Sequence, residues 1–518
     1  MQRSLSVSAS TERSARDLAA AIRARELSAR EVVEAHAWRL HNCQPRTNAL
    51  ACDRFADALA EAEAADERIA AAGPGDPLPP FLGVPCTVKE SIALRGMPNC
   101  AGMVALRDRR SETTAPAAQR LIDAGFIPLG VTNTSELTMW IESVNRVYGR
   151  TRNAYDPRRT AGGSSGGEGA AVGSGGSPVG LGSDIAGSIR VPAFFNGVFG
   201  HKPSPGLVPN TGQFPSTAGE AAFMLTLGPL ARHAEDLMPV TSIVSGPDGQ
   251  DERCVERELG DPEAVELTRL RVLVADDASL VPTRRELREA RDGAARALQD
   301  AGARCETVSL KQLRRALELF LAALGDGAGV TLNELLEQAG AQPRGPRTWL
   351  DALRGRGDHT TAILITLAVE RAHAHLPPGR TRRALAAAVS LREEVAGILG
   401  ADAVLLHQPH PRVAPRHGAT IGRAWVITPA AVFNLLGLPV TQVPLGLNPR
   451  GLPLGVQVAA AAGNDHLTIA AALELERRFG GWVRPPRQDV RRLTVTPRYL
   501  RTQHLRATIP VVNGTRSA

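Results

Sequence analysis

The sequence predicts an α/β architecture, because short apolar runs typical of strands alternate with helical patterns along most of the chain. Its 518 residues suffice for a large hydrophobic core, and a composition of 43% hydrophobic and 22% charged residues is typical of globular proteins. Only 4% of the residues are aromatic, so we expect a core built mainly from Ala, Val, Leu and Ile.

The first elements lie near the N-terminus. Residues 13–72 place apolar side chains at three- and four-residue steps, which predicts helices, and Ser28 with Glu31 forms a capping-box pattern. The run FLGVPCTVKES over 81–91 predicts a strand, and residues 113–133 predict a helix followed by a strand.

The same alternation returns in the second half of the chain. Strands are expected over 270–277, 401–409 and 437–446, and helices over 288–302 and 464–481. These elements extend the α/β pattern almost to the C-terminus.

The region between these parts is different. Residues 305–400 predict helices only, which could form a cap over a site or simply pack on the outside of the fold. Residues 486–518 are basic and have no clear period, so we expect a partly disordered C-terminal arm. We therefore expect a single domain over 1–485 with a helical insertion.

Charge and cysteine content restrict the function. The net charge of +7 could suit nucleic acid, but the charge is dispersed and has no aromatic–basic motif, so no nucleic-acid partner is expected. Six isolated cysteines predict neither a metal site nor a disulfide framework and favour a cytoplasmic protein. No secretory signal is expected, because the N-terminus has no apolar region. No transmembrane segment is expected either, since the longest uncharged run, 424–449, contains four prolines.

The stretch GGSSGGEGAAVGSGGSPVGLGSDIAGSIRVP, at 162–192, is the most unusual feature of the sequence. Its interleaved apolar residues disfavour a flexible linker, and it lacks the lysine of a phosphate-binding Walker loop and the spacing of a dinucleotide loop. A G-x-S-x-G match at Ser164 and Ser165 is preceded by a turn-like segment instead of a strand. The residues DIAGSIR, ending near Ser188, remain a candidate oxyanion hole, because glycine lets backbone amides converge.

This stretch resembles the amidase signature. The segment GVPCTVKES, the segment GVTNTSEL, the ADAVLLHQP strand and FNLLGLPVTQVPLG resemble other landmarks of that family, and the resemblance covers about residues 12–485. Within the family, PAFFNGVFGHKPSPG looks closest to the fatty-acid amide hydrolase branch. The resemblance implies an amidase-signature fold with a mixed central β-sheet covered by helices on both faces.

The resemblance also implies a Ser–Ser–Lys triad. Ser188 would be the nucleophile, Ser164 the bridging serine in a cis peptide and Lys89 the base; the 24-residue separation of the serines selects Ser164 over Ser165. The oxyanion hole would be formed by the backbone N–H groups of Ile185, Ala186, Gly187 and Ser188.

Other residues have expected supporting roles. Ser165, Asp184 and Arg190 would hold the site together, whereas Met139 and Trp140 could line an acyl pocket or belong to the core. Ala186 stands where the family more often has glycine, and Glu90 where it usually has aspartate. A lysine acts as a base near neutral pH only if its ammonium form is destabilised, and the apolar strand before Lys89 favours burial. Without the resemblance, the preferred interpretation would be that Lys89 lies on the surface and pairs with Glu90.

Three functions follow in order of preference. The first is an amidase that cleaves fatty-acyl or aryl amides through an acyl-enzyme on Ser188, with side activity on esters, anilides or carbamates. The second is a glutamine-hydrolysing subunit of a tRNA-dependent amidotransferase, and the third is a non-catalytic basic binding protein. The expected partner is a small amide, no cofactor is implied, and a homodimer is left open.

Overall fold

The computed structural model describes residues 10–486, apart from 74, 276–281, 327–330, 344 and 375–377. Nearly all of the predicted C-terminal arm, from residue 487 onward, lies outside the described residues. Within them, no helix has the length and apolar character required to cross a membrane.

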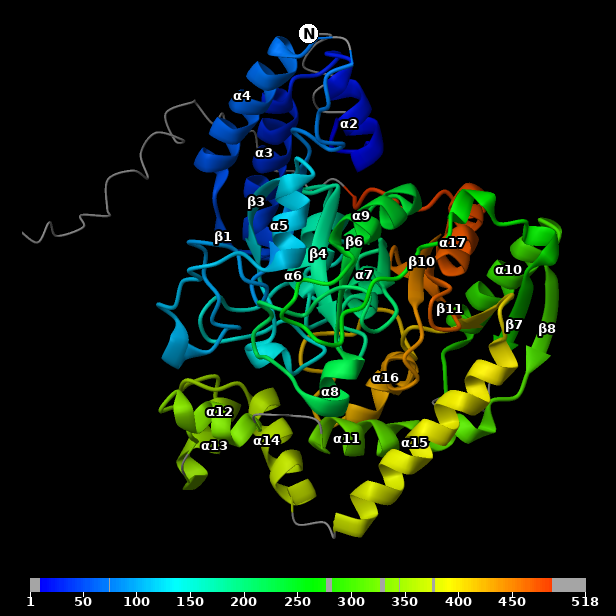
Figure 1. The fold of residues 1–518 in the computed structure, drawn as a ribbon. Coiled ribbons are helices and arrows are strands. Elements are labelled where there is room, and N and C mark those ends of the chain that lie inside the picture. The colour runs from blue at the N-terminus through cyan, green and yellow to red at the C-terminus, as the bar shows by residue number, and fades with distance from the viewer. Residues whose placement is uncertain are drawn as a thin grey trace, which may run out of the picture. The chain divides into compact units, whose positions relative to one another are not determined.

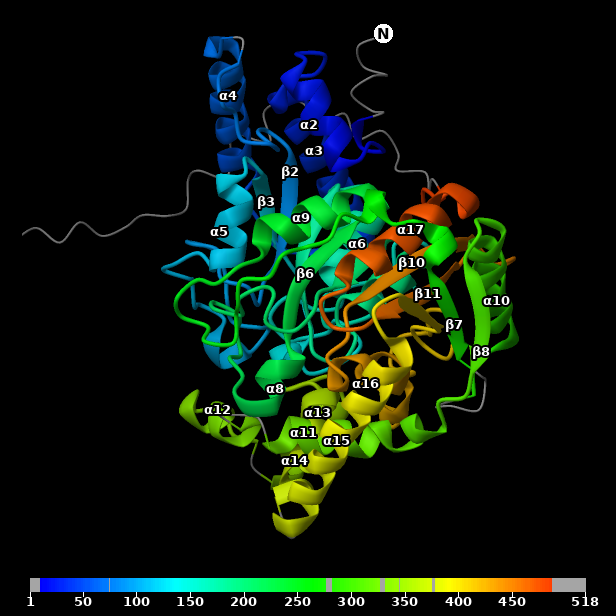
Figure 2. The same ribbon diagram turned by 45° about the vertical axis from the view of Figure 1, so that its right-hand side comes forward.

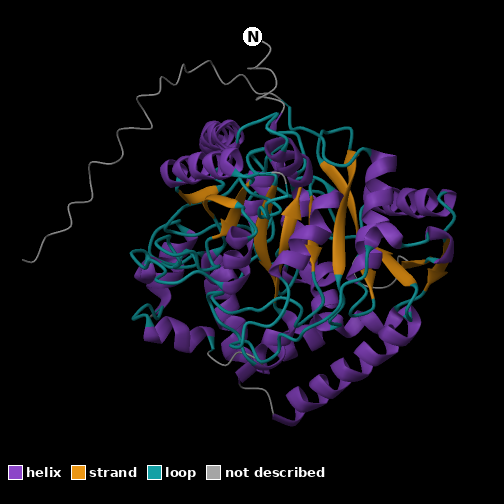
Figure 3. Ribbon diagram, turned by 45° about the horizontal axis from the view of Figure 1, so that its top comes forward, coloured by secondary structure: helices purple, strands orange, loops and turns teal. Residues whose placement is uncertain are grey.

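The described strands form one mixed sheet of eleven strands, in the order β1-β3-β2-β4-β6-β5-β10-β11-β9-β7-β8. Strand β2 is parallel to β3 and β4, and β7 is parallel to β8 and β9, whereas the remaining pairs are antiparallel. Figure 3 shows the strands as a layer with helices on both sides. The predicted α/β fold with a mixed central sheet is confirmed.

The strands have the following bounds: β1 Leu50–Asp53, β2 Pro85–Lys89, β3 Ile127–Thr132, β4 Val179–Asp184, β5 Phe199–Lys202, β6 Thr226–Ala231, β7 Arg271–Ala275, β8 Arg304–Val308, β9 Ala403–His407, β10 Val440–Leu447 and β11 Pro453–Ala460. The α-helices are α2 Ala15–Arg23, α3 Ala29–Thr47, α4 Phe55–Ala71, α5 Pro116–Asp123, α6 Gly166–Gly173, α7 Arg190–Phe195, α8 Gly219–Met224, α9 Leu237–Val244, α10 Arg285–Asp300, α11 Ala316–Asp326, α12 Leu332–Gln338, α13 Gly345–Leu353, α14 Thr361–Ala374, α15 Pro378–Leu399, α16 Thr428–Leu435 and α17 Asp465–Phe479.

Local sequence signals explain several of these boundaries. The Ser28 hydroxyl accepts a hydrogen bond from the Glu31 amide, and the Glu31 carboxylate accepts one from the Ser28 amide, so the predicted capping box opens α3. Helix α17 ends at Gly480, whose φ of 80° is favourable for glycine. Strand β1 was not predicted, because its four residues are too short to show a period of two and lie between two helices.

The core is largely aliphatic, as the composition predicts. Helix α17 packs on β10 and β11, and the main buried cluster consists mostly of Ala, Val, Leu and Ile side chains. Helices α11–α15 occupy most of the region predicted to be helical, at the opposite end of the described fold from α2–α4 (Figures 1 and 2). The prediction of helices only over 305–400 is wrong at its start, because strand β8, Arg304–Val308, pairs in parallel with β7 at the edge of the sheet. The described residues of 332–399 add helices and no strand.

The glycine-serine stretch is regular structure and not a linker. It forms α6, then β4, then the turn that leads into α7, and nearly all of its residues are buried. Small residues are required here by close packing: a Cβ atom on Gly167 would lie 2.4 Å from the backbone of Asn133. The stretch therefore brings two serine-bearing turns to one side of the sheet.

Candidate active site

Lys89 is the last residue of β2, and its side chain is fully buried. Its Nζ atom lies 2.7 Å from Ser164 Oγ and 2.9 Å from Ser183 Oγ. Burial lowers the pKa of Lys89 to about 7, although the negative charges of Asp184, Glu168 and Glu90 oppose this shift. A neutral amine beside a serine hydroxyl can accept that hydroxyl's proton.

The alternative of a surface Lys89 paired with Glu90 is wrong. The Glu90 carboxylate is buried and accepts hydrogen bonds from the amides of Cys100 and Ala101 and from the Tyr148 hydroxyl. Glu90 therefore holds the backbone of a neighbouring loop, and Lys89 faces the serines instead.

Ser164 is fixed in the turn that precedes α6. The Gly163–Ser164 peptide bond is cis, and the Ser164 carbonyl oxygen accepts hydrogen bonds from the hydroxyls of Thr134 and Ser143, each at 2.9 Å. The Ser143 hydroxyl also accepts a hydrogen bond from the Gly166 amide. These contacts orient the Ser164 side chain toward Lys89.

Ser188 lies in the turn between β4 and α7, and Ser165 connects this turn to that of Ser164. The Ser165 amide donates to the Ser188 carbonyl oxygen at 3.2 Å, and the Ser165 hydroxyl donates to the carbonyl oxygen of Ser183 at 3.2 Å. The Ser188 side chain is almost buried and makes no hydrogen bond with a described residue. The structure thus brings the turns of both predicted catalytic serines together through Ser165.

Asp184 and Arg190 form a fully buried ion pair beneath Ser188. Arg190 Nη2 lies 3.0 Å from Asp184 Oδ1, and Nε lies 3.1 Å from Oδ2. Burial alone would raise the pKa of Asp184, but the Arg190 charge dominates and holds it far below its usual range. Arg190 also donates to Asn434, Gln457 and the Ala430 carbonyl, so every part of its guanidinium is engaged.

The same carboxylate shapes the turn that was expected to form the oxyanion hole. Asp184 accepts hydrogen bonds from the amides of Gly187 at 2.7 Å and Ile189 at 3.0 Å. The Gly187 amide is thus committed to Asp184, which differs from the expected role of this amide as an oxyanion donor. Within the described residues, no group accepts a hydrogen bond from the amides of Ile185, Ala186 or Ser188.

Met139 and Trp140 lie next to the Ser164 turn. A Cβ atom on Gly163 would lie 2.6 Å from the Trp140 carbonyl oxygen, so the two backbones are in close contact. The Met139 side chain packs against the cluster that contains Leu137 and Leu364, and the Trp140 indole donates to Thr420 Oγ1 at 2.9 Å. Both residues are therefore beside the site and partly anchored in the surrounding protein.

Sequence reasoning missed two buried groups near Lys89. Ser183 gives Lys89 its second hydrogen bond, and Glu168 accepts hydrogen bonds from the hydroxyls of Thr87 and Thr132 at 2.6 and 2.8 Å. Burial raises the pKa of Glu168 to about 8. The register of β2 against its neighbours, which is absent from a local pattern, was needed to find either residue.

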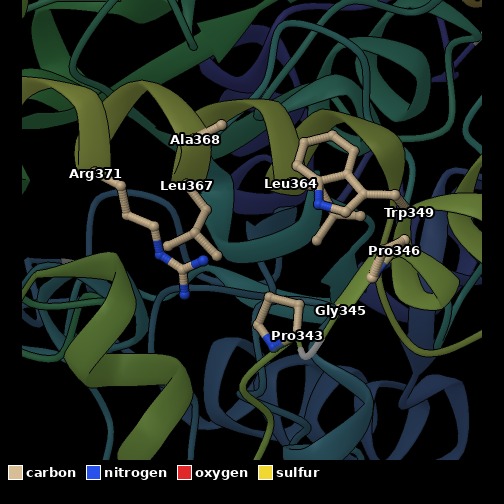
Figure 4. A pocket seen from close by; sticks show the side chains of 8 residues that line it. All are labelled: Pro343, Gly345, Pro346, Trp349, Leu364, Leu367, Ala368 and Arg371. Carbon is tan, nitrogen blue, oxygen red and sulfur yellow. The ribbon is translucent and has the colours of Figure 1, made fainter.

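A cavity of about 590 Å³ lies elsewhere, between α13 and α14. Figure 4 shows Trp349, Leu364 and Leu367 around it, with Arg371 as its charged lining residue. It contains neither a nucleophile nor a base, so it is not the place of the chemistry. Within the described ranges, His, Cys, Asp and Glu side chains nowhere form a group that could hold a metal ion.

Comparison with known proteins assigns this chain to a class of enzyme. It belongs to the amidase signature family, because the Amidase family matches residues 31–469, and it is an amide hydrolase.

Its relatives include fatty-acid amide hydrolase 2-A of Danio rerio, which is 40% identical over 92% of this chain and 91% of that protein. Fatty-acid amide hydrolase 2 of Homo sapiens is 39% identical over 90% and 89% of the two chains. A solved bacterial aryl acylamidase of the amidase signature family has a TM-score of 0.76, with 25% identity over 90% of this chain and 96% of that chain.

Proposed function

We propose that this chain hydrolyses acyl amides through an acyl-enzyme on Ser188, with Ser164 as the proton relay and Lys89 as the base. The observation that carries the proposal is the buried Lys89 amine, 2.7 Å from Ser164 Oγ and without an ion-pair partner among the described residues. An amine held in this way is poised to take a proton near neutral pH.

The first half of the reaction forms the acyl-enzyme. Lys89 Nζ accepts the Ser164 proton as Ser164 accepts the proton of Ser188, and Ser188 Oγ attacks the amide carbonyl carbon. The carbonyl oxygen becomes an oxyanion, for which the amides of Ile185, Ala186 and Ser188 are the donors. Collapse of this intermediate breaks the C–N bond, and the proton returns through Ser164 to the leaving amine.

The second half regenerates the enzyme. Water replaces the amine, gives its proton to the same relay and attacks the acyl carbon on Ser188. Collapse of the resulting intermediate breaks the bond between Ser188 Oγ and the acyl carbon, and the relay returns the proton to Ser188. The products are a carboxylic acid and ammonia or an amine. Esters, anilides and carbamates place a carbonyl in the same position, so we expect side activity on them.

The substrate class follows from the relatives and from the surroundings of the site. The similarity to fatty-acid amide hydrolases, at 39–41% identity, supports an extended apolar acyl group as the substrate of this chain. The similarity to an aryl acylamidase supports an aromatic acyl group. Met139 and Trp140, whose backbone packs against Gly163 beside Ser164, stay candidates for the acyl pocket. A cytoplasmic location and a homodimer also stay predictions, the first supported by six cysteines without a disulfide in the described structure.

The test is amine release from a series of amides, from acetyl to decanoyl and including an aryl acyl group, by the wild type and by Ser188→Ala. We expect kcat/KM to rise with acyl length and to fall by about 10⁴-fold or more in Ser188→Ala. Ser245→Ala is a matched control, since its hydroxyl contacts only the Ser242 carbonyl near the surface. Activity that survives in Ser188→Ala contradicts the mechanism, and activity confined to short or aryl amides contradicts the fatty-acyl assignment.

A further inference from the structure

The segment 136–143 packs against the turn that carries Ser164. It follows β3 by way of Asn133–Ser135, and its backbone lies against Gly163, where a Cβ atom would approach the Trp140 oxygen to 2.6 Å and the Glu142 nitrogen to 2.8 Å. Its last residue, Ser143, donates to the Ser164 carbonyl oxygen. A shift of this segment would therefore move the backbone that holds Ser164.

The segment has an unusual backbone that needs support from outside. Leu137 and Thr138 have φ values of 52° and 59°, in the left-handed region that L-residues with branched side chains rarely occupy. Leu137 is buried in a cluster with Leu336 and Leu364 of the helical insertion. Such a conformation persists only where the surrounding contacts determine it.

The first contact is Glu136, a buried carboxylate. It accepts hydrogen bonds from His359 Nδ1 at 2.9 Å and from the Thr360 amide at 2.7 Å, both immediately before α14. His359 Nε2 lies 2.7 Å from the Ala341 carbonyl oxygen, so both ring nitrogens face acceptors. Burial opposes protonation of His359, but the hydrogen bond to Glu136 and the charge of that carboxylate raise its pKa. Glu136 thus ties the start of the segment to the helical insertion through His359 and Thr360.

The second contact is Glu142, also buried. It accepts hydrogen bonds from the Gly418 amide at 2.9 Å and from the Thr420 hydroxyl at 2.6 Å, and it has no ion-pair partner among the described residues. The Thr420 hydroxyl in turn accepts the Trp140 indole N–H at 2.9 Å. One hydroxyl therefore joins the carboxylate and the indole.

Thr420 belongs to the connection between β9 and α16, which reaches both sides of the site. Near its start, the Pro415 carbonyl oxygen accepts from the Thr160 amide, four residues before Ser164. Beyond it, Ala430 of α16 packs where a Cβ on Gly187 would lie, 2.4 Å from the Ala430 Cβ. The connection thus links the Ser164 turn to the Ser188 turn.

We infer that Glu136, Glu142 and Thr420 are positioning residues that clamp the segment 136–143 at both ends and thereby determine which acyl groups the enzyme accepts. This inference rests on the proposed acyl-amide function and extends it to the selection of acyl length. The clamp acts through Met139 and Trp140, which it fixes beside Ser164, and it takes no part in proton transfer.

The test compares Thr420→Val with Thr420→Ser. Valine keeps the shape of threonine but removes the hydroxyl between Glu142 and Trp140, whereas serine retains it. The readout is the ratio of kcat/KM for decanoyl over acetyl p-nitroanilide, with KM and kcat determined separately. The rate at which a small methyl fluorophosphonate labels Ser188 is measured in parallel as a reading of the chemistry alone.

For Thr420→Val we expect the decanoyl-to-acetyl ratio to change by about fivefold or more through KM, while Ser188 labelling stays within about twofold of wild type. Thr420→Ser is expected to restore the wild-type ratio. A ratio unchanged in Thr420→Val, or an equal loss of kcat on every substrate, overturns the clamp while leaving the proposed function intact. A wild type that hydrolyses none of the series and is not labelled on Ser188 overturns both.

Discussion

The protein has two fully buried lysines at the ends of strands of the central sheet. Lys89 is the last residue of β2, and Lys202 is the last residue of β5. Burial lowers the pKa of each to about 7. Their hydrogen bonds differ: Lys89 Nζ contacts the hydroxyls of Ser164 and Ser183, whereas Lys202 Nζ donates to the Pro203 carbonyl oxygen at 2.9 Å. Burial brings the pKa of both amines near neutral pH, but only Lys89 lies beside hydroxyl groups whose protons it can accept, because a carbonyl has no proton to give.

The charges around the two lysines shift their pKa values in addition to burial. Burial lowers the pKa of Lys202 most, and the charge of Arg190 lowers it further. The charge of Asp184 raises the pKa of both lysines. Burial is the largest cause of the pKa shift of each lysine, ahead of these charges. The two positions are thus nearly matched electrostatically, which makes Lys202 an internal control for Lys89.

The largest expected effect is that of Lys89→Met. Methionine fills a similar volume without an amine, so Ser164 loses its proton acceptor, and kcat/KM for an acyl anilide should fall by about 10²–10⁴-fold. The free energy of unfolding, measured by urea denaturation, verifies that the variant is folded. Activity close to the wild-type value would show that Lys89 is not the base.

The pH dependence of kcat/KM gives an intermediate effect. Protonated Lys89 cannot accept a proton, so activity should fall as the pH drops below the Lys89 pKa of about 7 and level off above it. The decline should approach about tenfold per pH unit, and it should be absent from the residual activity of Lys89→Met. A wild-type profile that is flat between about pH 6 and about pH 8, roughly one unit on either side of the Lys89 pKa of about 7, would contradict a titrating lysine.

Lys202→Met should have the smallest effect. A buried apolar side chain of similar volume replaces an amine that makes one hydrogen bond, so we expect kcat/KM within about tenfold of wild type and a free energy of unfolding within about 1–2 kcal/mol. The acidic limb of the pH profile should remain. If the decline of activity at low pH is lost in Lys202→Met, the titrating group is Lys202, and the two lysines do not differ in the way proposed.

The sequence allowed the α/β fold, five of the eleven strands, many of the helices, and the candidates Lys89, Ser164 and Ser188 to be predicted. The serines and the lysine could be found because the motif around each is local. The hydrogen bond from Lys89 to Ser183 could not, because it depends on the pairing of β2 with β4. The commitment of the Gly187 amide to Asp184 depends likewise on how one turn closes.

The contacts of the segment 136–143 were the least predictable. Glu142 and Thr420 are 278 residues apart, and Glu136 and His359 are 223 residues apart, so no periodicity or motif links them. From sequence alone a glutamate is predicted to be exposed, because acidic side chains are rarely buried unless they are paired. Only the three-dimensional fold reveals that each has polar donors around it.

The most direct test of the account is the labelling of the enzyme by a small fluorophosphonate as a function of pH, with peptide mass mapping, in the wild type, Lys89→Met and Lys202→Met. We predict a single adduct on Ser188, formed at a rate that rises with pH up to about 7 in the wild type and in Lys202→Met. In Lys89→Met the rate should be slow and independent of pH. An adduct on another residue, or equal labelling in Lys89→Met and the wild type, would contradict a Lys89-activated Ser188.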